Sequence, residues 1–281
     1  MGDQQSGAAG TASARKAIFI TGGGSGIGRA TARHFAARGW LVGIADINEA
    51  GMAETAALLP GGLSSIHRLD VRERDQWRIA LANFVAVSGG RLDVLFNNAG
   101  VGLGGNYDTL SPEDADLVID INLRGVVNGI YAALPHLRAT PGSCILNTGS
   151  ASGFYGSAGL SIYSATKFGV RALTEALDIE FAPEGIKVRD LMPGFIDTPL
   201  LLRAIPGSNE TSRDRVVSAG LEFTPVEVVA QAAWDAVHGD AVHTPVGKTA
   251  KRLAFASRFL PGRLRKQFKS NQSTNRLTLG N

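Results

Sequence analysis

Tyr163 and Lys167 stand four positions apart, and their types and spacing suit acid–base chemistry. Both fall in a predicted helix over residues 162–181, where this spacing directs two side chains to one face. A phenol has an unperturbed pKa near ~10 and is a poor base at neutral pH, but a nearby ammonium group stabilises the phenolate and lowers that pKa. The same spacing also occurs in ordinary amphipathic helices, so the surrounding residues must decide between the two interpretations.

Two further polar residues could complete such a site. Ser150 follows a predicted strand over residues 143–148, at the carboxyl edge where ligands of open α/β sheets bind, and its hydroxyl could polarise a substrate oxygen. Its segment, residues 147–153, carries several hydroxyls and could also be a polar loop. Asn122 lies in a predicted helix, where asparagine has low propensity, so it either bends that helix or holds a water molecule.

A glycine-rich turn over residues 21–28 joins a predicted strand, residues 17–21, to a predicted helix, residues 27–38. Glycines permit positive φ and let backbone N–H groups approach a pyrophosphate at a helix N-terminus. The turn lacks the literal G-x-G-x-x-G string and reads Thr-Gly-x-x-x-Gly-x-Gly instead; a tight turn without a ligand is the alternative. The residues expected to bind a dinucleotide here are Gly22, Gly24, Ser25, Gly26, Ile27 and Gly28.

Asp46 ends the second predicted strand, where a carboxylate can accept hydrogen bonds from an adenosine ribose. Its negative charge would repel a 2′-phosphate, and neither the glycine turn nor positions 47 and 48 hold a lysine or arginine. With Ile47 beside it, Asp46 therefore favours NAD over NADP. The alternative is that Asp46 caps the helix that begins near Asn48.

Strands and helices alternate along the chain. Nearly continuous apolar strands separated by helices must pair in parallel and be covered on both faces, so the sequence predicts an α/β fold with one doubly wound sheet. The predicted strands cover residues 17–21, 40–46, 65–71, 92–97, 143–148, 186–192 and 242–246. The predicted helices cover residues 27–38, 48–59, 74–87, 112–122, 123–137, 162–181 and 225–237, the last with Thr224 as N-cap.

Composition limits the class of protein. With 281 residues, 44% hydrophobic and 19% charged, the chain is not disordered, and it has no apolar run near the ~18 residues of a membrane span. A single cysteine, Cys144, excludes a disulfide framework and a cysteine-based zinc site, so no metal is expected. Residues 1–14 have no signal-peptide core and are predicted to be a flexible leader, which suggests a cytoplasmic location.

Charge is unevenly distributed. Residues 241–281 hold nine Lys or Arg and no Asp or Glu, which leaves residues 1–240 with a net charge of −6. We therefore divide the chain into the leader, a cofactor-binding and catalytic domain over residues 15–247 with a flap at about 195–223, and a basic, aromatic extension over residues 248–281. The extension could lie on an anionic membrane, but packing against the body or a partner subunit is favoured. No nucleic-acid motif accompanies the charge.

Together these motifs resemble the short-chain dehydrogenase/reductase family, in its single-domain branch of about 250 residues. The resemblance covers roughly residues 15–246 and implies a Rossmann-like fold of about seven strands. It rests on the glycine turn, Asp70-Val71, Asn97-Asn98-Ala99-Gly100, Asn122, Ser150, Tyr163-Ser164-Ala165-Thr166-Lys167, and Pro193-Gly194 with Thr198. A small departure is Gly149, where family members often carry a second serine.

The resemblance implies roles for these positions. Tyr163 would be the general acid/base, Lys167 would lower its pKa and hold the nicotinamide ribose, Ser150 would bind the substrate oxygen, and Asn122 would keep a water that links the lysine to solvent. Other positions would contact the cofactor: Asp70 and Val71 the adenine, Asn98, Ala99 and Gly100 the adenosine side, and Pro193, Gly194, Ile196 and Thr198 the nicotinamide. The family also implies a homo-oligomer, a tetramer or dimer, built partly from the helices over residues 123–137 and 162–181.

The predicted substrate-facing residues are mostly apolar. Besides Ser150 and Tyr163 they include Phe154, Tyr155 and Phe195, the loop after Gly100, and leucines of the flap. They favour a lipid-like, steroid-like or aromatic secondary alcohol or ketone, although the leucines could simply seal the flap onto the core. The alternatives are an NADP(H)-dependent reductase of carrier-bound oxoacyl groups and a cofactor-binding regulator without turnover.

Overall fold

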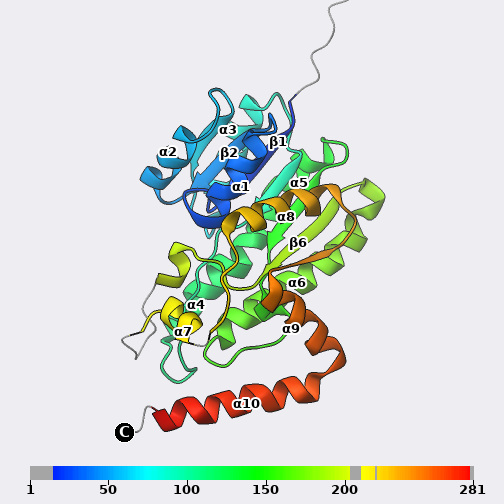
Figure 1. The fold of residues 1–281 in the computed structure, drawn as a ribbon. Helices are drawn as coiled ribbons and strands as arrows, with labels where there is room; N and C mark the ends of the chain where they lie inside the picture. Colours follow the sequence, from blue (N-terminus) through cyan, green and yellow to red (C-terminus); the bar gives the residue numbers. More distant parts are fainter. Residues whose placement is uncertain (1–14, 203–209, 219, 279–281) are drawn as a thin grey trace, which may run out of the picture.

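Seven parallel strands form one sheet in the computed structural model, which describes residues 15–202, 210–218 and 220–278 (Figure 1). Along the sheet the order is β3-β2-β1-β4-β5-β6-β7, which confirms the predicted doubly wound, Rossmann-like class. The central strands are buried throughout because helices cover both faces. The strands are β1 (Ala17–Thr21), β2 (Leu41–Asp46), β3 (Ser64–Arg68), β4 (Val94–Asn97), β5 (Cys144–Thr148), β6 (Lys187–Pro193) and β7 (His243–Val246).

Helices form a layer on each side of the sheet. One layer buries Phe35, Met52 and Val229, and the other buries Trp77, Ile130 and Val170. The first layer contains α1 (Gly26–Ala36), α2 (Glu49–Ala57) and α8 (Val226–His238); the second contains α3 (Arg74–Val87), α5 (Gly125–Arg138) and α6 (Ser161–Phe181).

The strand order reverses between β1 and β4, because β2 lies on one side of β1 and β4 on the other. In such sheets, ligands bind outside the carboxyl ends of the strands at this switch point. The glycine turn follows β1, Asn98 follows β4 and Ser150 follows β5 by one intervening residue. The topology therefore brings the predicted cofactor and catalytic segments to one edge.

Three local predictions were wrong. The predicted helices over 112–122 and 123–137 form one continuous run, α4 (Pro112–Ile119), a π-turn at Asp120–Arg124, and α5. Strand β3 ends at Arg68 because the Asp70 N–H turns away to donate to Gln76 Oε1 at 2.8 Å. Helix α8 has Pro225 at its N-cap position, and Thr224 lies outside the helix, paired with Ile196 in a short bridge in which its N–H donates to the Phe195 carbonyl oxygen at 2.8 Å.

The continuous run Pro112–Arg138 is long and apolar enough to cross a membrane by length and composition, although the sequence analysis expected no such segment. In this fold its apolar side chains Val126, Ile130, Ala133 and Leu137 are buried in the layer beneath the sheet. Packing in the protein core accounts for its hydropathy.

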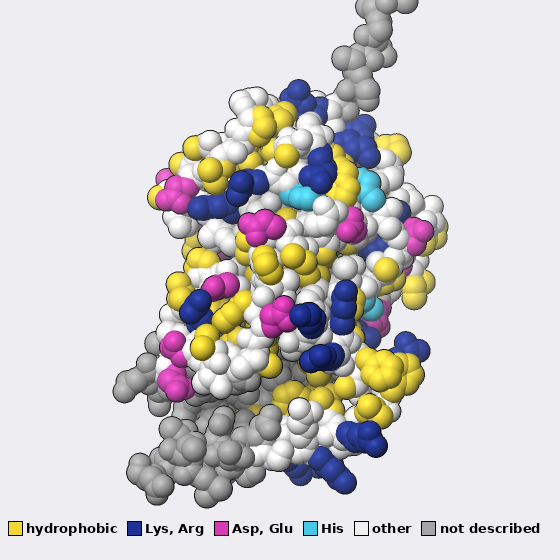
Figure 2. Space-filling model, viewed as in Figure 1, with side chains coloured by type: hydrophobic (Ala, Val, Ile, Leu, Met, Phe, Trp, Pro, Cys, Tyr) yellow, Lys and Arg dark blue, Asp and Glu magenta, His cyan; other side chains and the backbone are white. Residues whose placement is uncertain are grey.

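The C-terminal extension forms two helices, α9 (Lys248–Phe259) and α10 (Pro261–Thr278), at the end of the molecule opposite α2 and α3 (Figure 1). Part of it packs on the body: Leu264 is buried, and the Phe268 ring stacks on Tyr155 with centroids 5.4 Å apart. Hydrophobic and basic side chains lie together over α9 in Figure 2, where Phe255 and Phe259 are both 59% exposed. Membrane contact by this surface is the less favoured alternative and is untested, and the leader, residues 1–14, lies outside the described residues.

Candidate active site

The first two turns of α6 bring Tyr163 and Lys167 together with Ser150. Lys167 is buried, its Nζ donates to the Thr148 carbonyl oxygen at 2.7 Å, and Nζ lies 5.6 Å from the centroid of the Tyr163 ring. The Ser150 hydroxyl is placed to hydrogen-bond the Tyr163 hydroxyl, an interaction that lowers the pKa of Tyr163. The three residues singled out from the sequence thus form one cluster at the carboxyl end of β5.

The ionisation of this cluster differs from the prediction. Burial raises the pKa of Tyr163, and the hydrogen bond from Ser150 opposes that rise only in part. Burial also lowers the pKa of Lys167 to about 8, against the opposing charge of Asp190. We expected Lys167 to lower the pKa of Tyr163; in the protein alone that pKa is raised, because loss of solvent outweighs the hydrogen bond from Ser150. At neutral pH the pair is therefore a phenol beside an ammonium group.

Ser150 is fixed by a short 3-10 turn, η2 (Ala151–Gly153). Its Oγ accepts a hydrogen bond from the Ser152 N–H at 3.1 Å and caps this turn. A Cβ at Gly153 would lie 3.0 Å from the Lys167 carbonyl oxygen, so the turn packs directly on α6. The Ser150 hydroxyl is thereby held at a fixed distance from the helix that carries Tyr163.

Asn122 is fully buried in the π-turn. Its Oδ1 accepts from the Val101 N–H and its Nδ2 donates to the Val101 carbonyl oxygen, both at 2.8 Å. The side chain therefore ties the loop after β4 to the helix, and π-turns of this kind are frequent at functional sites. The water relay that the resemblance implies stays a prediction.

The glycine turn forms a cradle of bare backbone. Gly22 and Gly26 have φ of 65° and 49°, and a Cβ at Gly28 would lie only 2.2 Å from the Gly22 carbonyl oxygen. Ser25 is the N-cap of α1 but makes no side-chain cap hydrogen bond, and the first turn holds no acidic residue. The start of α1 thus carries the positive end of a helix dipole that no acidic side chain of its first turn balances, which fits the pyrophosphate of a dinucleotide.

Asp46 lies beside this cradle at the end of β2. Its Oδ2 accepts from the Gly24 N–H and its Oδ1 from the Asn48 N–H, both at 3.0 Å. The side chain of Asn48, which accepts from the Gly51 N–H, is the cap of α2. Asp46 is therefore not the helix cap, and its partly exposed carboxylate stands next to the glycine turn, with Ile47 exposed beyond it.

Two residues that sequence reasoning missed hold the glycine turn in place. The Arg29 guanidinium donates to the Gly24 carbonyl oxygen at 2.5 Å and pairs with Glu54 at 2.7 Å. Thr55 Oγ1 donates to the Gly23 carbonyl oxygen at 2.9 Å and accepts from Arg29 Nε at 3.0 Å. The only sequence signal was a basic residue just after the last glycine, because its partners on α2 lie more than 20 positions away.

The predicted adenosine-side residues line the same edge. Asp70 is bound by Arg72 at 2.6 Å, which holds the pKa of its carboxyl below the usual value, and Val71 is buried beside it. Asn98 Nδ2 donates to the Thr21 carbonyl oxygen at 2.9 Å, and a Cβ at Gly22 would lie 3.0 Å from Ala99 Cα. The turn Asn98-Ala99-Gly100 thus abuts the glycine cradle, and Thr21, the first residue of the glycine motif, joins the two.

The segment after β6 closes the other side of the cradle. A Cβ at Gly26 would lie 3.1 Å from Thr198 Cγ2, so Thr198 lies directly over the glycine turn. Ile196 is buried, Pro193 is the last residue of β6, and the Gly194 N–H donates to the Val246 carbonyl oxygen of β7 at 3.0 Å. The role of these residues beside a nicotinamide stays a prediction.

The predicted substrate-facing residues come from three segments. Phe154 packs under the Arg171 guanidinium at 5.3 Å, Tyr155 stacks on Phe268, and Phe195 is partly buried. Leu200 of the flap packs over the loop after β4, where a Cβ at Gly102 would meet it at 3.3 Å. Part of the flap, including Ile205, lies outside the described residues.

Known proteins share this arrangement. Residues 16–206 match the family described as short chain dehydrogenase. The chain belongs to the short-chain dehydrogenase family. Its relatives include the meso-2,3-butanediol dehydrogenase of Serratia marcescens, 35% identical over 222 residues (78% of this chain, 86% of that protein), and the cyclohexanol dehydrogenase of Acinetobacter sp. (strain SE19), 38% identical over 191 residues (66% and 75%).

A solved short-chain dehydrogenase/reductase of Burkholderia phymatum in complex with NAD has a similar structure, with a TM-score of 0.76 at 27% identity over 90% of this chain and 95% of that one. The short-chain dehydrogenase described here is thus an oxidoreductase that acts on alcohols and ketones with NAD(P). Family membership leaves the cofactor preference and the substrate to be argued from the site.

Proposed function

We propose that this protein is an NAD(H)-dependent dehydrogenase that interconverts hydrophobic secondary alcohols and their ketones. The observation that carries the proposal is the cluster of Ser150, Tyr163 and Lys167 beside the glycine cradle. The cluster supplies two hydroxyl groups and one cation, which suit proton transfer to an oxygen that gains negative charge.

The protein's own groups handle the proton. In ketone reduction, Ser150 and Tyr163 would both hydrogen-bond the carbonyl oxygen, and the Tyr163 hydroxyl would give its proton to that oxygen. In alcohol oxidation, Tyr163 would take the proton back. Lys167, fixed on the Thr148 carbonyl, stabilises the resulting phenolate by its charge. A nicotinamide dinucleotide bound by the glycine turn, with its nicotinamide beside Pro193, Gly194, Ile196 and Thr198, would supply or accept the hydride.

Asp46 supports NAD over NADP. Its carboxylate stands beside Gly24, where it can accept hydrogen bonds from ribose hydroxyls and would repel a 2′-phosphate. The nearby Arg29 is engaged by Glu54 and by backbone oxygens, so its charge is already balanced by a carboxylate.

The substrate side supports a hydrophobic ring or chain. The side chains expected to face the substrate are aromatic and aliphatic: Phe154 and Tyr155 follow Ser150 on the chain, and Leu200 packs over the loop after β4. A relative named for cyclohexanol, a cyclic secondary alcohol, is consistent with this chemistry.

The test is the absorbance of reduced cofactor formed by the purified protein with NAD⁺ or NADP⁺ and secondary alcohols from short to bulky. Tyr163→Phe should abolish turnover, and Tyr107→Phe, at a tyrosine that is 74% exposed, is the matched control and should not. Faster turnover of small polyols than of apolar alcohols would contradict the substrate class. Turnover with NADP⁺ alone would contradict the role of Asp46.

A further inference from the structure

A buried carboxylate lies behind the catalytic lysine. Asp190 on β6 is completely buried, and it is paired in register with Asn147 on β5. Asn147 Nδ2 donates to Thr174 Oγ1 on α6 at 3.0 Å, so this face of the two strands is the one that α6 covers. Asp190 and Lys167 therefore lie in the same layer, between the sheet and α6.

The Thr148–Gly149 segment lies between these two groups. Lys167 Nζ donates to the Thr148 carbonyl oxygen, and a Cβ at Gly149 would lie 3.7 Å from Asp190 Oδ2. Glycine at position 149 thus leaves the carboxylate next to the peptide that receives the ammonium group. Two opposite buried charges across one peptide group can compensate each other's loss of water.

His243 on β7 holds the carboxylate in place. Its Nδ1 lies 3.0 Å from both Asp190 oxygens, and its Nε2 lies 2.9 Å from Glu175 Oε1. A neutral imidazole donates from one nitrogen only, so carboxylates at both nitrogens favour the imidazolium form. Although burial lowers the pKa of His243, the hydrogen bonds and charges of Asp190 and Glu175 raise it overall.

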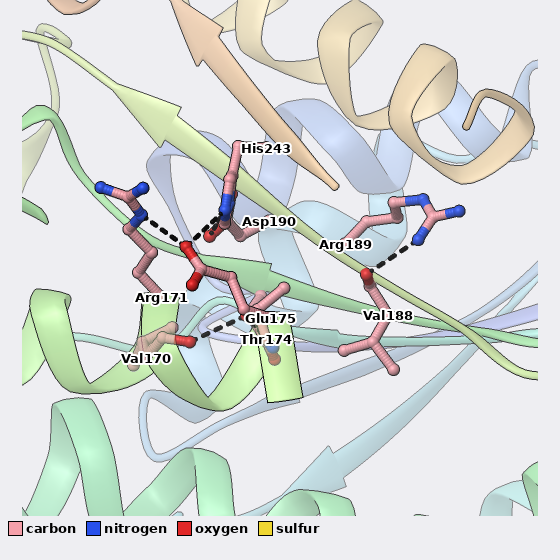
Figure 3. A network of polar contacts seen from close by, with 9 residues as sticks. Val170, Arg171, Thr174, Glu175, Val188, Arg189, Asp190 and His243 are labelled. Carbon is pink, nitrogen blue, oxygen red and sulfur yellow. Dashed lines mark hydrogen bonds and ion pairs between the residues drawn. The ribbon is translucent and has the colours of Figure 1, made fainter. Parts of the chain in front are cut away.

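The network continues to the surface along α6. Arg171 Nε donates to Glu175 Oε1 at 2.9 Å, and the Glu175 side chain is 49% exposed. Figure 3 shows Arg171, Glu175, His243 and Asp190 as one continuous chain. Tyr163, Lys167, Arg171 and Glu175 follow each other at four-residue steps, so the acid–base pair and this network occupy one stripe of α6.

We propose that Asp190, held by His243 and Glu175, is a positioning residue for Lys167: its buried carboxylate keeps the lysine protonated and seated on the Thr148 carbonyl. The inference deepens the proposed function, because it assigns the group that maintains the charge beside Tyr163. The charged groups of the described chain that face Asp190 are Lys167, Arg171 and Glu175 on α6 and His243 on β7.

Two substitutions test this with opposite signs. Asp190→Asn keeps the shape of the side chain and removes the negative charge, so the ionisation midpoint of Lys167 should fall by on the order of one pH unit. His243→Gln removes a positive charge from the same network and should raise that midpoint. Asp178→Asn is the matched control: Asp178 also joins α6 to β6, through Arg189, and should leave the midpoint unchanged.

The midpoint is read by ¹³C NMR of protein labelled at the lysine ε-carbon, with the Lys167 signal assigned by its loss in Lys167→Arg. This reading needs no substrate, so a lack of alcohol turnover would refute the proposed function without touching this result. If the protein oxidises alcohols, the pH above which kcat falls should be lower in Asp190→Asn than in the unmodified protein. The same pH should be unchanged in Asp178→Asn.

An unchanged midpoint in Asp190→Asn, or an equal fall in Asp178→Asn, would overturn the proposal. Circular dichroism establishes that each variant is folded. If Asp190→Asn does not fold, His243→Gln decides alone: a higher Lys167 midpoint supports the counter-charge, and an unchanged or lower one refutes it.

Discussion

Gly28→Ala should sharply weaken dinucleotide binding. A Cβ at position 28 would lie 2.2 Å from the Gly22 carbonyl oxygen and 2.8 Å from its carbonyl carbon. These are backbone atoms that no rotamer change can move, and an ordinary contact needs about 1 Å more. Either the glycine turn or the start of α1 must shift by that amount.

The expected magnitude follows from this displacement. Overpacking of this kind costs about 1–3 kcal/mol, which corresponds to a Kd for NADH roughly 5- to 150-fold higher if the strain is relieved by moving the cradle. If the cradle does not move, the same free energy is lost from the stability of the protein. Measuring both quantities separates these cases.

The assay is a fluorescence titration with NADH together with a thermal melt. Gly61→Ala is the matched control, because a Cβ there would meet no atom within 4 Å. A Gly28→Ala protein that binds NADH and melts like the Gly61→Ala protein would refute the assignment of this turn as a tightly packed cofactor cradle.

Three further predictions concern pH, cofactor choice and assembly. Because burial raises the pKa of Tyr163 above its ordinary value, the phenol stays protonated from about pH 6 to about pH 9. Ketone reduction, which uses the phenol, should therefore stay nearly constant over this range, whereas alcohol oxidation, which uses the phenolate, should accelerate. Initial rates of ketone reduction that fall severalfold over the same range would contradict this. Asp46→Ala should reduce about tenfold the ratio of kcat/KM with NAD⁺ to kcat/KM with NADP⁺. An unchanged ratio would exclude repulsion of the 2′-phosphate of NADP⁺ by the Asp46 carboxylate. Tyr131 on α5 and Ile179 on α6 are 73% and 76% exposed. If these two helices form the expected oligomer interface, Ile179→Asp should lower the molecular mass measured by light scattering. Val87→Asp, at an exposed residue on α3, is the control and should leave that mass unchanged.

Much of the fold followed from local pattern. Apolar strands separated by amphipathic helices dictated a parallel doubly wound sheet, and β1 and α3 have the bounds that the sequence predicted. Contacts distant in sequence accompany the errors: Thr224, expected to cap α8, is instead paired with Ile196 in a bridge. The π-turn likewise contains Asn122, whose side chain bonds Val101 on the loop after β4, a contact that sequence spacing does not reveal.

The sequence by itself determined which residue types stand at the ends of the strands, because glycines, a carboxylate and a tyrosine–lysine pair are local motifs. Only the tertiary structure decided their ionisation and support. The pKa of Tyr163 depends on how much water the fold removes, and the Arg29–Glu54 and Asp190–His243 contacts join segments that are distant in sequence. Desolvation and long-range contact are properties of the packed chain, so no local pattern encodes them.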